Sequence, residues 1–290
     1  MIYFTLPVFF NNYKLNNYFI QLNHEHSEYF KEEVTFTALS GNFPYNYWFG
    51  GFNNNNINKA VGYDDFINCG NCCLAPLRFN CANIFLTNED LDDVKMNLIL
   101  ELNQTGSNSI SIANLTIYKQ LKEKFPYYHY VFSREAHLIN EFSAEIVNLL
   151  QEQNFFSLIE IPESLSTNLN FLKEIKEKDK VELMIGNKNC FGCNYFMECK
   201  KNEHLNQYNF SEQMLISKCA LRNNIKLNIT LEDIKNIYYP LGFKYFAFDN
   251  YIFNSQINLL DIYTNFFIKD EYKYQVYKNF YHYNNKENTI

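Results

Sequence analysis

Short runs of apolar residues recur along the whole chain, and stretches with apolar residues at helical spacing lie between most of them. Each run has the length of a single buried strand and is bounded by polar or turn-forming residues. The pattern therefore predicts eight strands, at residues 2–9, 34–39, 77–84, 109–113, 128–133, 157–161, 181–185 and 243–248.

The stretches between the runs predict helices that cover a sheet. Pro126 ends one of these helices before the next strand begins. Thr230, with Asp233 three residues later, has the pattern of a helix N-cap, and Gly242 marks the exit of the same helix. The predicted helices comprise residues 91–102, 117–125, 142–152, 169–178, 231–239 and 259–280, the last being one long helix near the end of the chain.

Strand and helix patterns that alternate eight times predict an α/β fold with a parallel sheet, closed into a (β/α)8 TIM-type barrel. Such a barrel takes ~250 residues. One domain at residues 1–282 therefore accounts for nearly all of the 290 residues, with residues 283–290 as a tail. An open, doubly wound sheet is the alternative, but the turn at residues 9–13 lacks the glycines of a phosphate-binding loop.

Composition narrows the class of protein. Hydrophobic residues make up 47% of the chain, with 28 Phe and 23 Tyr, which is ample for a large core. The formal net charge of −7 disfavours nucleic acid as a partner, although a local basic patch would leave RNA binding open. The chain has neither an apolar run of membrane-spanning length nor the basic start of a signal peptide. We therefore expect a cytoplasmic protein without membrane contact, with its eight cysteines reduced.

Two segments interrupt the regular alternation. Residues 40–60 follow the second predicted strand and contain three glycines, the only tryptophan, Trp48, and a run of asparagines. Residues 187–228 follow the seventh strand and carry a group of cysteines. Loops that follow strands lie on the catalytic face of a (β/α)8 barrel. We therefore expect the cysteine loop at the barrel mouth and residues 40–60 over it, with Trp48 near any ligand.

The cysteine group is the most specific chemical pattern in the chain. Cys190 and Cys193 are separated by Phe and Gly, a spacing that lets both sulfurs reach one metal, and Cys199 and Cys219 follow in the same polar segment. Four thiolates suit either an iron–sulfur cluster, such as [4Fe–4S], or zinc. The uneven spacing favours the cluster, because zinc ribbons usually pair two Cys-x-x-Cys units. His204 lies in the same segment and is the reserve ligand.

A second group of cysteines is better explained by packing than by a second metal site. Cys69 and Cys72 again have the Cys-x-x-Cys spacing, but Cys73 belongs to an apolar stretch and Cys81 lies inside a predicted strand. Unpaired cysteine commonly behaves as a small buried hydrophobic residue. One of these thiols could still supply a fourth ligand in place of Cys219.

Polar residues at the exits of predicted strands are candidate catalytic groups, because active sites of this fold lie at the carboxyl ends of the strands. Carboxylates there could act as acid and base. The structural alternative for each residue is a helix cap or a solvated loop position. The candidates are Ser133 and Arg134 after the fifth strand, Glu160 and Glu163 at the end of the sixth, and Asp249 after the eighth.

The residues from Val181 to Asn187, followed by Cys190, Cys193 and Cys199, resemble the strand and cysteine-bearing loop of the peptidase U32 barrel family. Residues 131–135 resemble that family's strand that ends in a Ser-x-Glu turn, and residues 231–244 its helix before the last strand. The resemblance covers residues 105–250 and is specific only around the cysteines, whose spacing departs from the family's usual pattern. It implies a barrel that is either a collagenase-type peptidase or an iron–sulfur protein supporting hydroxylation of RNA bases or quinone precursors.

Two functional hypotheses follow from these patterns. In the first, the chain is an enzyme in which an iron–sulfur cluster or other metal at the mouth supports modification of a substrate that the sequence does not identify. In the second, structural zinc fixes a long loop, and the barrel is a non-catalytic binding module or protein partner. A closed shell of four thiolates favours structure, whereas a position on the catalytic face favours function.

Overall fold

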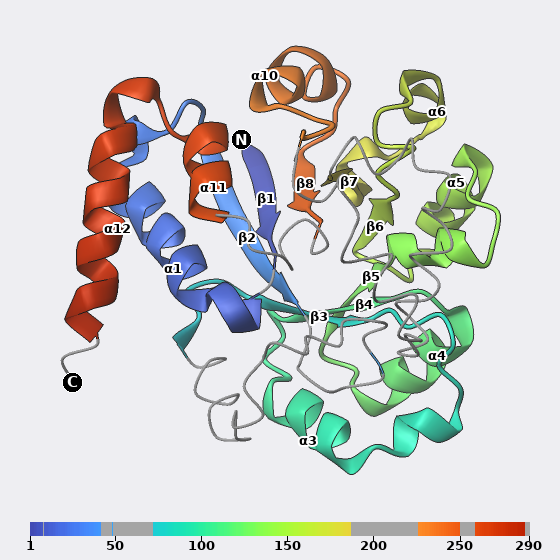
Figure 1. Ribbon diagram of the computed structural model, residues 1–290. Coiled ribbons are helices and arrows are strands. Elements are labelled where there is room, and N and C mark those ends of the chain that lie inside the picture. Colours follow the sequence, from blue (N-terminus) through green and yellow to red (C-terminus); the bar gives the residue numbers. More distant parts are fainter. Residues whose placement is uncertain (8, 42–47, 49–71, 187–225, 250–258, 288–290) are drawn as a thin grey trace, which may run out of the picture.

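The computed structural model describes residues 1–7, 9–41, 48, 72–186, 226–249 and 259–287. Its centre is a closed barrel of eight strands in sequence order, with β8 paired to β1, which confirms the predicted fold (Figure 1). The strands are β1 (Ile2–Leu6), β2 (Val34–Gly41), β3 (Leu77–Cys81), β4 (Ser109–Ile112), β5 (His129–Phe132), β6 (Leu158–Ile161), β7 (Val181–Ile185) and β8 (Tyr245–Phe248).

Every pair of neighbouring strands is parallel, so that all eight carboxyl ends open on the same side. The pairing of β1 with β2 shifts by one residue between Phe4 and Thr5, because Phe4 pairs with Phe36 but Thr5 pairs with Ala38. Beyond the shift, Thr5 and Ala38 are direct neighbours on adjacent strands.

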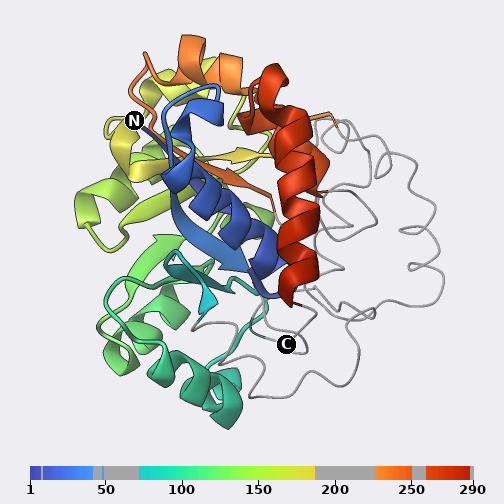
Figure 2. The same cartoon turned by 90° about the vertical axis from the view of Figure 1, so that its left-hand side faces the viewer.

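Helices surround the barrel on its outside (Figure 1). On one side, α1 and α11 lie next to β1 and β2, and α12 lies outside them, alongside α1 in both views (Figures 1 and 2). No helix among the described residues is both long and apolar enough to cross a membrane. The α-helices are α1 (Phe9–Glu25), α3 (Val94–Leu102), α4 (Leu115–Lys124), α5 (Ala144–Gln153), α6 (Leu169–Glu174), α10 (Leu231–Asp233), α11 (Leu259–Phe267) and α12 (Lys273–Glu287).

Side-chain caps fix where the helices begin. Asn114 and Ser143 each accept a hydrogen bond from a backbone N–H in the first turn of α4 and α5. Thr230 and Asp233 form the reciprocal capping box that the sequence indicated, and the chain continues into a π-helix, η7 (Ile234–Tyr238). Gly242 has a φ of +104°, which glycine adopts without strain, where the chain turns toward β8.

The prediction of one long final helix was wrong. The chain leaves α11 at Phe267, becomes extended at Ile268 and re-enters a helix only after the 3-10 turn η9 (Asp270–Tyr272). Ile268 forms an antiparallel bridge with Phe30, and the Lys31 N–H donates to the carbonyl of Phe267 over 2.8 Å. This tertiary pairing interrupts a sequence pattern that would otherwise continue as a helix. The helix α12 then runs to Glu287, past the boundary expected for the tail.

Candidate active site

The inside of the barrel is polar where (β/α)8 barrels usually pack bulky aliphatic residues. Side chains alternate along each strand, so that Glu160 points inward while Ile159 and Ile161 point toward the helices. The same alternation turns Arg78 inward between buried apolar neighbours. Contacts between non-adjacent strands show that these side chains point into the barrel. Arg78 of β3 contacts Glu182 of β7, and strands that do not pair can meet only across the interior.

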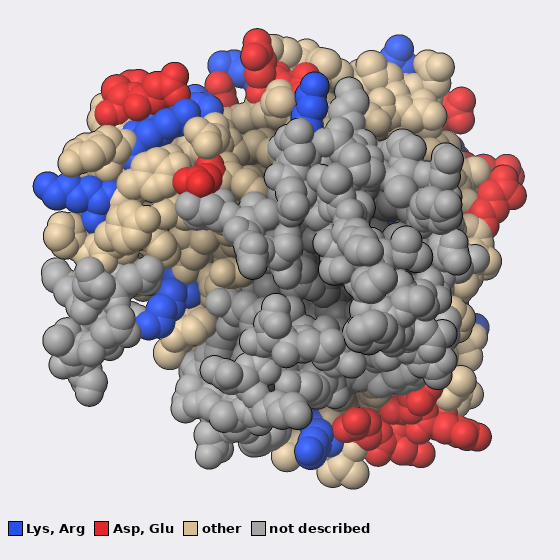
Figure 3. All heavy atoms as spheres, in the orientation of Figure 1, with Lys and Arg blue, Asp and Glu red and all other residues tan. Residues whose placement is uncertain are grey.

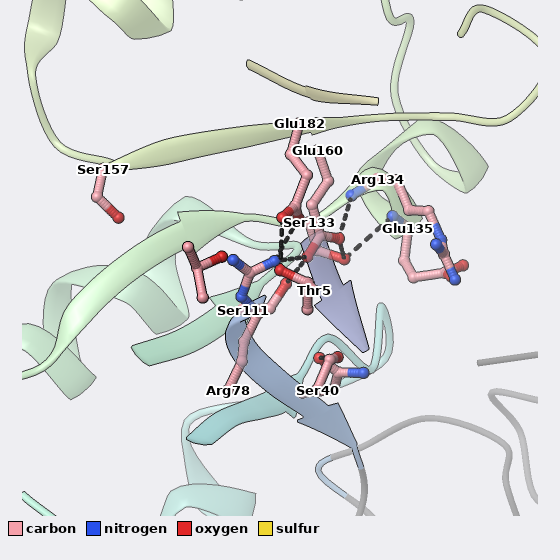
Figure 4. A network of polar contacts seen from close by, with 12 residues as sticks. Thr5, Ser40, Arg78, Ser111, Ser133, Arg134, Glu135, Ser157, Glu160 and Glu182 are labelled. Atoms are coloured by element: carbon pink, nitrogen blue, oxygen red, sulfur yellow. Dashed lines mark hydrogen bonds and ion pairs between the residues drawn. The ribbon is translucent and has the colours of Figure 1, made fainter. Parts of the chain in front are cut away.

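Arg78 is at the centre of the interior and joins two glutamates (Figure 4). Its Nη1 forms an ion pair with Glu182 of β7 and lies 3.5 Å from Oε1 of Glu160 on β6. Thr5 of β1 donates to the other oxygen of Glu182 over 2.7 Å. Burial opposes the charge of Arg78, but the two carboxylates outweigh it and raise the Arg78 pKa above its ordinary value.

Glu160 connects the interior to the mouth of the barrel. Ser111 of β4 donates to its Oε1 over 3.1 Å, while the Ser133 hydroxyl and the Arg134 backbone N–H donate to its Oε2 over 3.4 and 3.3 Å. Burial raises the pKa of Glu160, opposed by Arg78 and reinforced by Glu182. A carboxyl group with a raised pKa keeps its proton to a higher pH than an ordinary glutamate does.

A second ionic cluster surrounds Arg134 at the carboxyl ends of the strands. The guanidinium pairs with Asp249, and its Nε lies 3.2 Å from a carboxylate oxygen of Glu135 and 3.4 Å from one of Glu163. The carboxylates outweigh the effect of burial and raise the Arg134 pKa well above its ordinary value. Arg134 is therefore a fixed cation that draws together side chains from three different loops.

Local structure holds each of these side chains in place. Ser133 follows β5 and caps the 3-10 helix η4 (Arg134–Leu138), with its hydroxyl accepting from the Glu135 N–H over 3.2 Å. Asp249 follows β8, and its N–H donates to the carbonyl of Ile185 over 2.9 Å, so that it extends the pairing with β7. Glu163 follows β6 in a turn in which the Leu165 N–H bonds back to the Pro162 carbonyl. All three positions are fixed by backbone hydrogen bonds.

The structure brings together all five catalytic candidates from the sequence: Ser133, Arg134, Glu160, Glu163 and Asp249. Sequence reasoning missed Arg78 and Glu182, which form the centre of the same network. A signal for both was present, because each is a charged residue inside an apolar strand run, and such residues are rarely buried without a partner. The hydroxyls of Thr5 and Ser111 gave no comparable signal.

The predicted metal ligands Cys190, Cys193, Cys199 and Cys219 lie outside the described residues, as do His204 and Cys69. Among the described residues, no group of three or more His, Cys, Asp or Glu side chains is arranged to hold a metal ion. The mouth carboxylates instead surround Arg134.

Two other expectations concern described residues. Cys81 is fully buried on the outward face of β3, where burial raises the pKa of its thiol, and this agrees with the packing interpretation. Trp48 is also buried, and its indole N–H donates to the Asp90 carbonyl over 2.8 Å after β3. Its position is explained by packing, and the rest of residues 42–60 lies outside the described residues.

Searches of the chain against known protein families, curated proteins and solved structures found no match. The sheet topology establishes the fold, and the side chains inside the barrel are the evidence for its chemistry. The outer surface carries charges of both signs, interspersed around the edge of the face in Figure 3. The buried network of Arg78, Glu160, Glu182 and the Arg134 cluster is the chemically distinctive part of the described chain.

Proposed function

We propose that this chain is an enzyme that modifies a polar substrate at the carboxyl end of its barrel, with Glu160 moving a proton. In this proposal, a metal or iron–sulfur centre on Cys190, Cys193, Cys199 and Cys219 supports the reaction, in keeping with the U32-like resemblance. The observation that carries the proposal is the buried ionic network that runs from Arg78 through Glu160 to the mouth.

The energetics of that network favour a functional role. Removing ions from water has a cost of several kcal/mol per ion, and replacing buried ion pairs by well-packed apolar residues is often neutral or stabilising, by roughly 1–4 kcal/mol. A barrel selected for stability alone would fill these positions with Val, Ile or Leu. The two arginines and their carboxylates are therefore better explained by chemistry than by packing.

The described residues suggest how the site would work. Arg134 holds Asp249 and Glu163 at the mouth, where their oxygens can accept hydrogen bonds from a substrate with hydroxyl or amino groups. Ser133 lies against Glu160 and could relay a proton between that carboxyl and the mouth. Because Arg134 carries its charge at all relevant pH values, this part of the site stays fixed while Glu160 changes its protonation state.

The cysteine segment begins and ends beside this site. The chain leaves β7 at Gly186, and the Gly186 N–H donates to the Asn228 side chain over 2.7 Å while the Asn228 N–H donates to the Gly186 carbonyl over 3.0 Å. The cysteines thus belong to an insertion whose two ends are tied together at the carboxyl end of β7. When bound there, an iron–sulfur centre would supply electron transfer, whereas zinc would fix the insertion.

Metal content tests the cofactor half of the proposal. The full chain is purified without oxygen, and its visible spectrum, iron, sulfide and zinc are measured for the wild type, Cys193→Ser and Cys81→Ala. We expect a coloured protein that loses its iron in Cys193→Ser and keeps it in Cys81→Ala. A colourless zinc protein would favour the non-catalytic binding module, and a protein without metal would reject the proposed centre.

Product formation tests the enzymatic half. Cells that lack the chain are complemented with the wild type, Glu160→Gln or the surface variant Glu152→Gln, and their small molecules and RNA bases are compared by mass spectrometry. We expect a product that requires Glu160 but not Glu152. A product that the Glu160→Gln cells make as well as the wild type would show that Glu160 does not carry the chemistry.

A further inference from the structure

Glu160 and Glu182 are direct partners in the pairing of β6 with β7, so that their carboxyl groups lie side by side in the barrel. Both approach the same nitrogen, Nη1 of Arg78. The side chains of all three residues are at least nine-tenths buried. Two carboxyl groups therefore share one cation in a space with little water, where a second negative charge is strongly disfavoured.

The two carboxyl groups have different surroundings. Glu182 receives the close ion pair from Arg78 and the 2.7 Å hydrogen bond from Thr5, both of which stabilise a carboxylate. Glu160 lies 3.5 Å from the same guanidinium nitrogen, and its other contacts, from 3.1 to 3.4 Å, are hydroxyls and one backbone N–H. The two closest donors to the pair, Arg78 and Thr5, thus both contact Glu182, whereas the contacts to Glu160 are all longer.

We propose that Glu160 and Glu182 hold a single proton between them at neutral pH, with Glu160 as the neutral acid and Glu182 as the carboxylate. Arg78 is then a positioning residue that fixes the negative charge on Glu182. The use of this proton in catalysis rests on the proposed function, whereas its presence on Glu160 does not.

The charged and titratable groups around the pair agree with this assignment. Burial is the largest influence that raises the pKa of Glu160, and Glu182 acts in the same direction. Arg78 from β3 and Arg134 from the loop after β5 act against it without cancelling it. On the other side, burial raises the pKa of Tyr245 of β8, and Tyr3, Asp179 and Glu182 act in the same direction.

Each carboxyl oxygen of Glu160 has a hydroxyl beside it, Ser111 at Oε1 and Ser133 at Oε2. A hydroxyl can accept a hydrogen bond as well as donate one, so that the neutral acid finds an acceptor at either oxygen. In a proton transfer to a substrate, the O–H bond of Glu160 breaks and a bond from hydrogen to a substrate atom forms. The new negative charge on Glu160 would then face Arg78 Nη1 and the Arg134 N–H, which are already in place.

Carbon-13 NMR of the full chain labelled at the glutamate carboxyl carbons tests the proposal without substrate or cofactor. The Glu160 and Glu182 signals are assigned from their loss in Glu160→Gln and Glu182→Gln. At neutral pH, we expect Glu160 to have the chemical shift of a neutral acid and Glu182 that of a carboxylate. In Glu182→Gln, we expect the titration midpoint of Glu160 to fall by about one pH unit, or about tenfold in proton affinity.

A second variant guards against a folding defect in Glu182→Gln. Thr5→Val keeps the shape of the side chain but removes its hydrogen bond to Glu182, so that the titration midpoint of Glu160 should shift. Glu152→Gln on the surface of α5 should change neither signal. A wild-type Glu160 that is ionised at neutral pH, or one whose titration is unchanged in both Glu182→Gln and Thr5→Val, would overturn the assignment. A shared proton in a protein without metal or product would reject the proposed function alone.

Discussion

The two faces of the same barrel strands have opposite chemistry. On the outer face, Phe4 of β1 and Phe248 of β8 pack against Phe267 of α11 in edge-to-face contacts with ring centroids 5.0 and 5.8 Å apart. On the inner face, the neighbouring positions carry hydroxyl, guanidinium and carboxyl groups, among them Thr5 and Arg78. Because successive side chains of a strand point to opposite faces, adjacent residues of one strand lie in these two different environments.

This difference shows where the fold obtains its stability and where it accommodates chemistry. The layer between strands and helices is apolar and rich in aromatic rings, so that it can supply most of the hydrophobic stabilisation. The interior then does not have to be apolar, and ions can be held there by partners on opposite strands. The comparison predicts that the two faces respond differently to substitution and to pH.

Phe267→Ala should have the largest effect, because Phe267 is fully buried and contacts rings from β1, β2, β8, α1 and α11. We expect a loss of about 3–5 kcal/mol in the free energy of unfolding, with little dependence on pH. Urea unfolding followed by circular dichroism measures it. Phe155, at 41% exposed, is the matched control, and a loss as large in Phe155→Ala would contradict the special role of the outer layer.

Arg78→Met should come next, because it leaves Glu160 and Glu182 buried together without their cation. We expect a loss of about 3–5 kcal/mol at neutral pH, decreasing toward acidic pH as the carboxyl groups become protonated. The triple variant Arg78→Met, Glu160→Gln, Glu182→Gln should recover most of the loss. If the triple variant unfolded as readily as Arg78→Met, shape rather than charge would account for the defect.

Glu160→Gln should have a smaller effect that depends on pH. The pKa of Glu160 is raised in the folded chain above its ordinary value of 4.5, so that the folded protein binds the proton more tightly than the unfolded one. This contribution to stability is complete below pH 4.5 and is lost as the pH rises through the folded pKa. Relative to Glu160→Gln, the free energy of unfolding of the wild type should therefore decrease as the pH rises through this range. The decrease should be about 1.4 kcal/mol for each unit by which the pKa of Glu160 is raised.

Urea unfolding of both proteins across the acidic and neutral range measures this difference. A difference in unfolding free energy that stays constant with pH would show that the pKa of Glu160 is the same in the folded and unfolded chains.

The surface ion pair of Lys176 with Glu152 should have the smallest effect, although its 2.9 Å distance is shorter than the 3.5 Å between Arg78 and Glu160. Both side chains are more than half exposed, and water and salt screen their attraction. Lys176→Met should leave the urea midpoint unchanged within error. A clear shift of that midpoint would mean that burial does not separate the two kinds of ion pair.

The fold was accessible from the sequence because its signals are local. Each strand needed only a short apolar run, and all eight predicted strands are present, with ends that differ by a few residues. The capping box at Thr230 was equally local. The break between α11 and α12 was missed because it depends on a bridge from Ile268 to Phe30, far away along the chain. The metal centre on Cys190, Cys193, Cys199 and Cys219 stays a prediction.

The sequence by itself determined the barrel, its direction and the candidates at its mouth, since alternation of strand and helix places every strand exit on one face. Only the tertiary structure decided which side chains meet across the interior. Arg78 and Glu182 are separated by 104 residues and lie on strands that do not pair, so that no local pattern relates them. Closure of the barrel brings them into contact, and burial there raises the pKa of Glu160, the strand neighbour of Glu182.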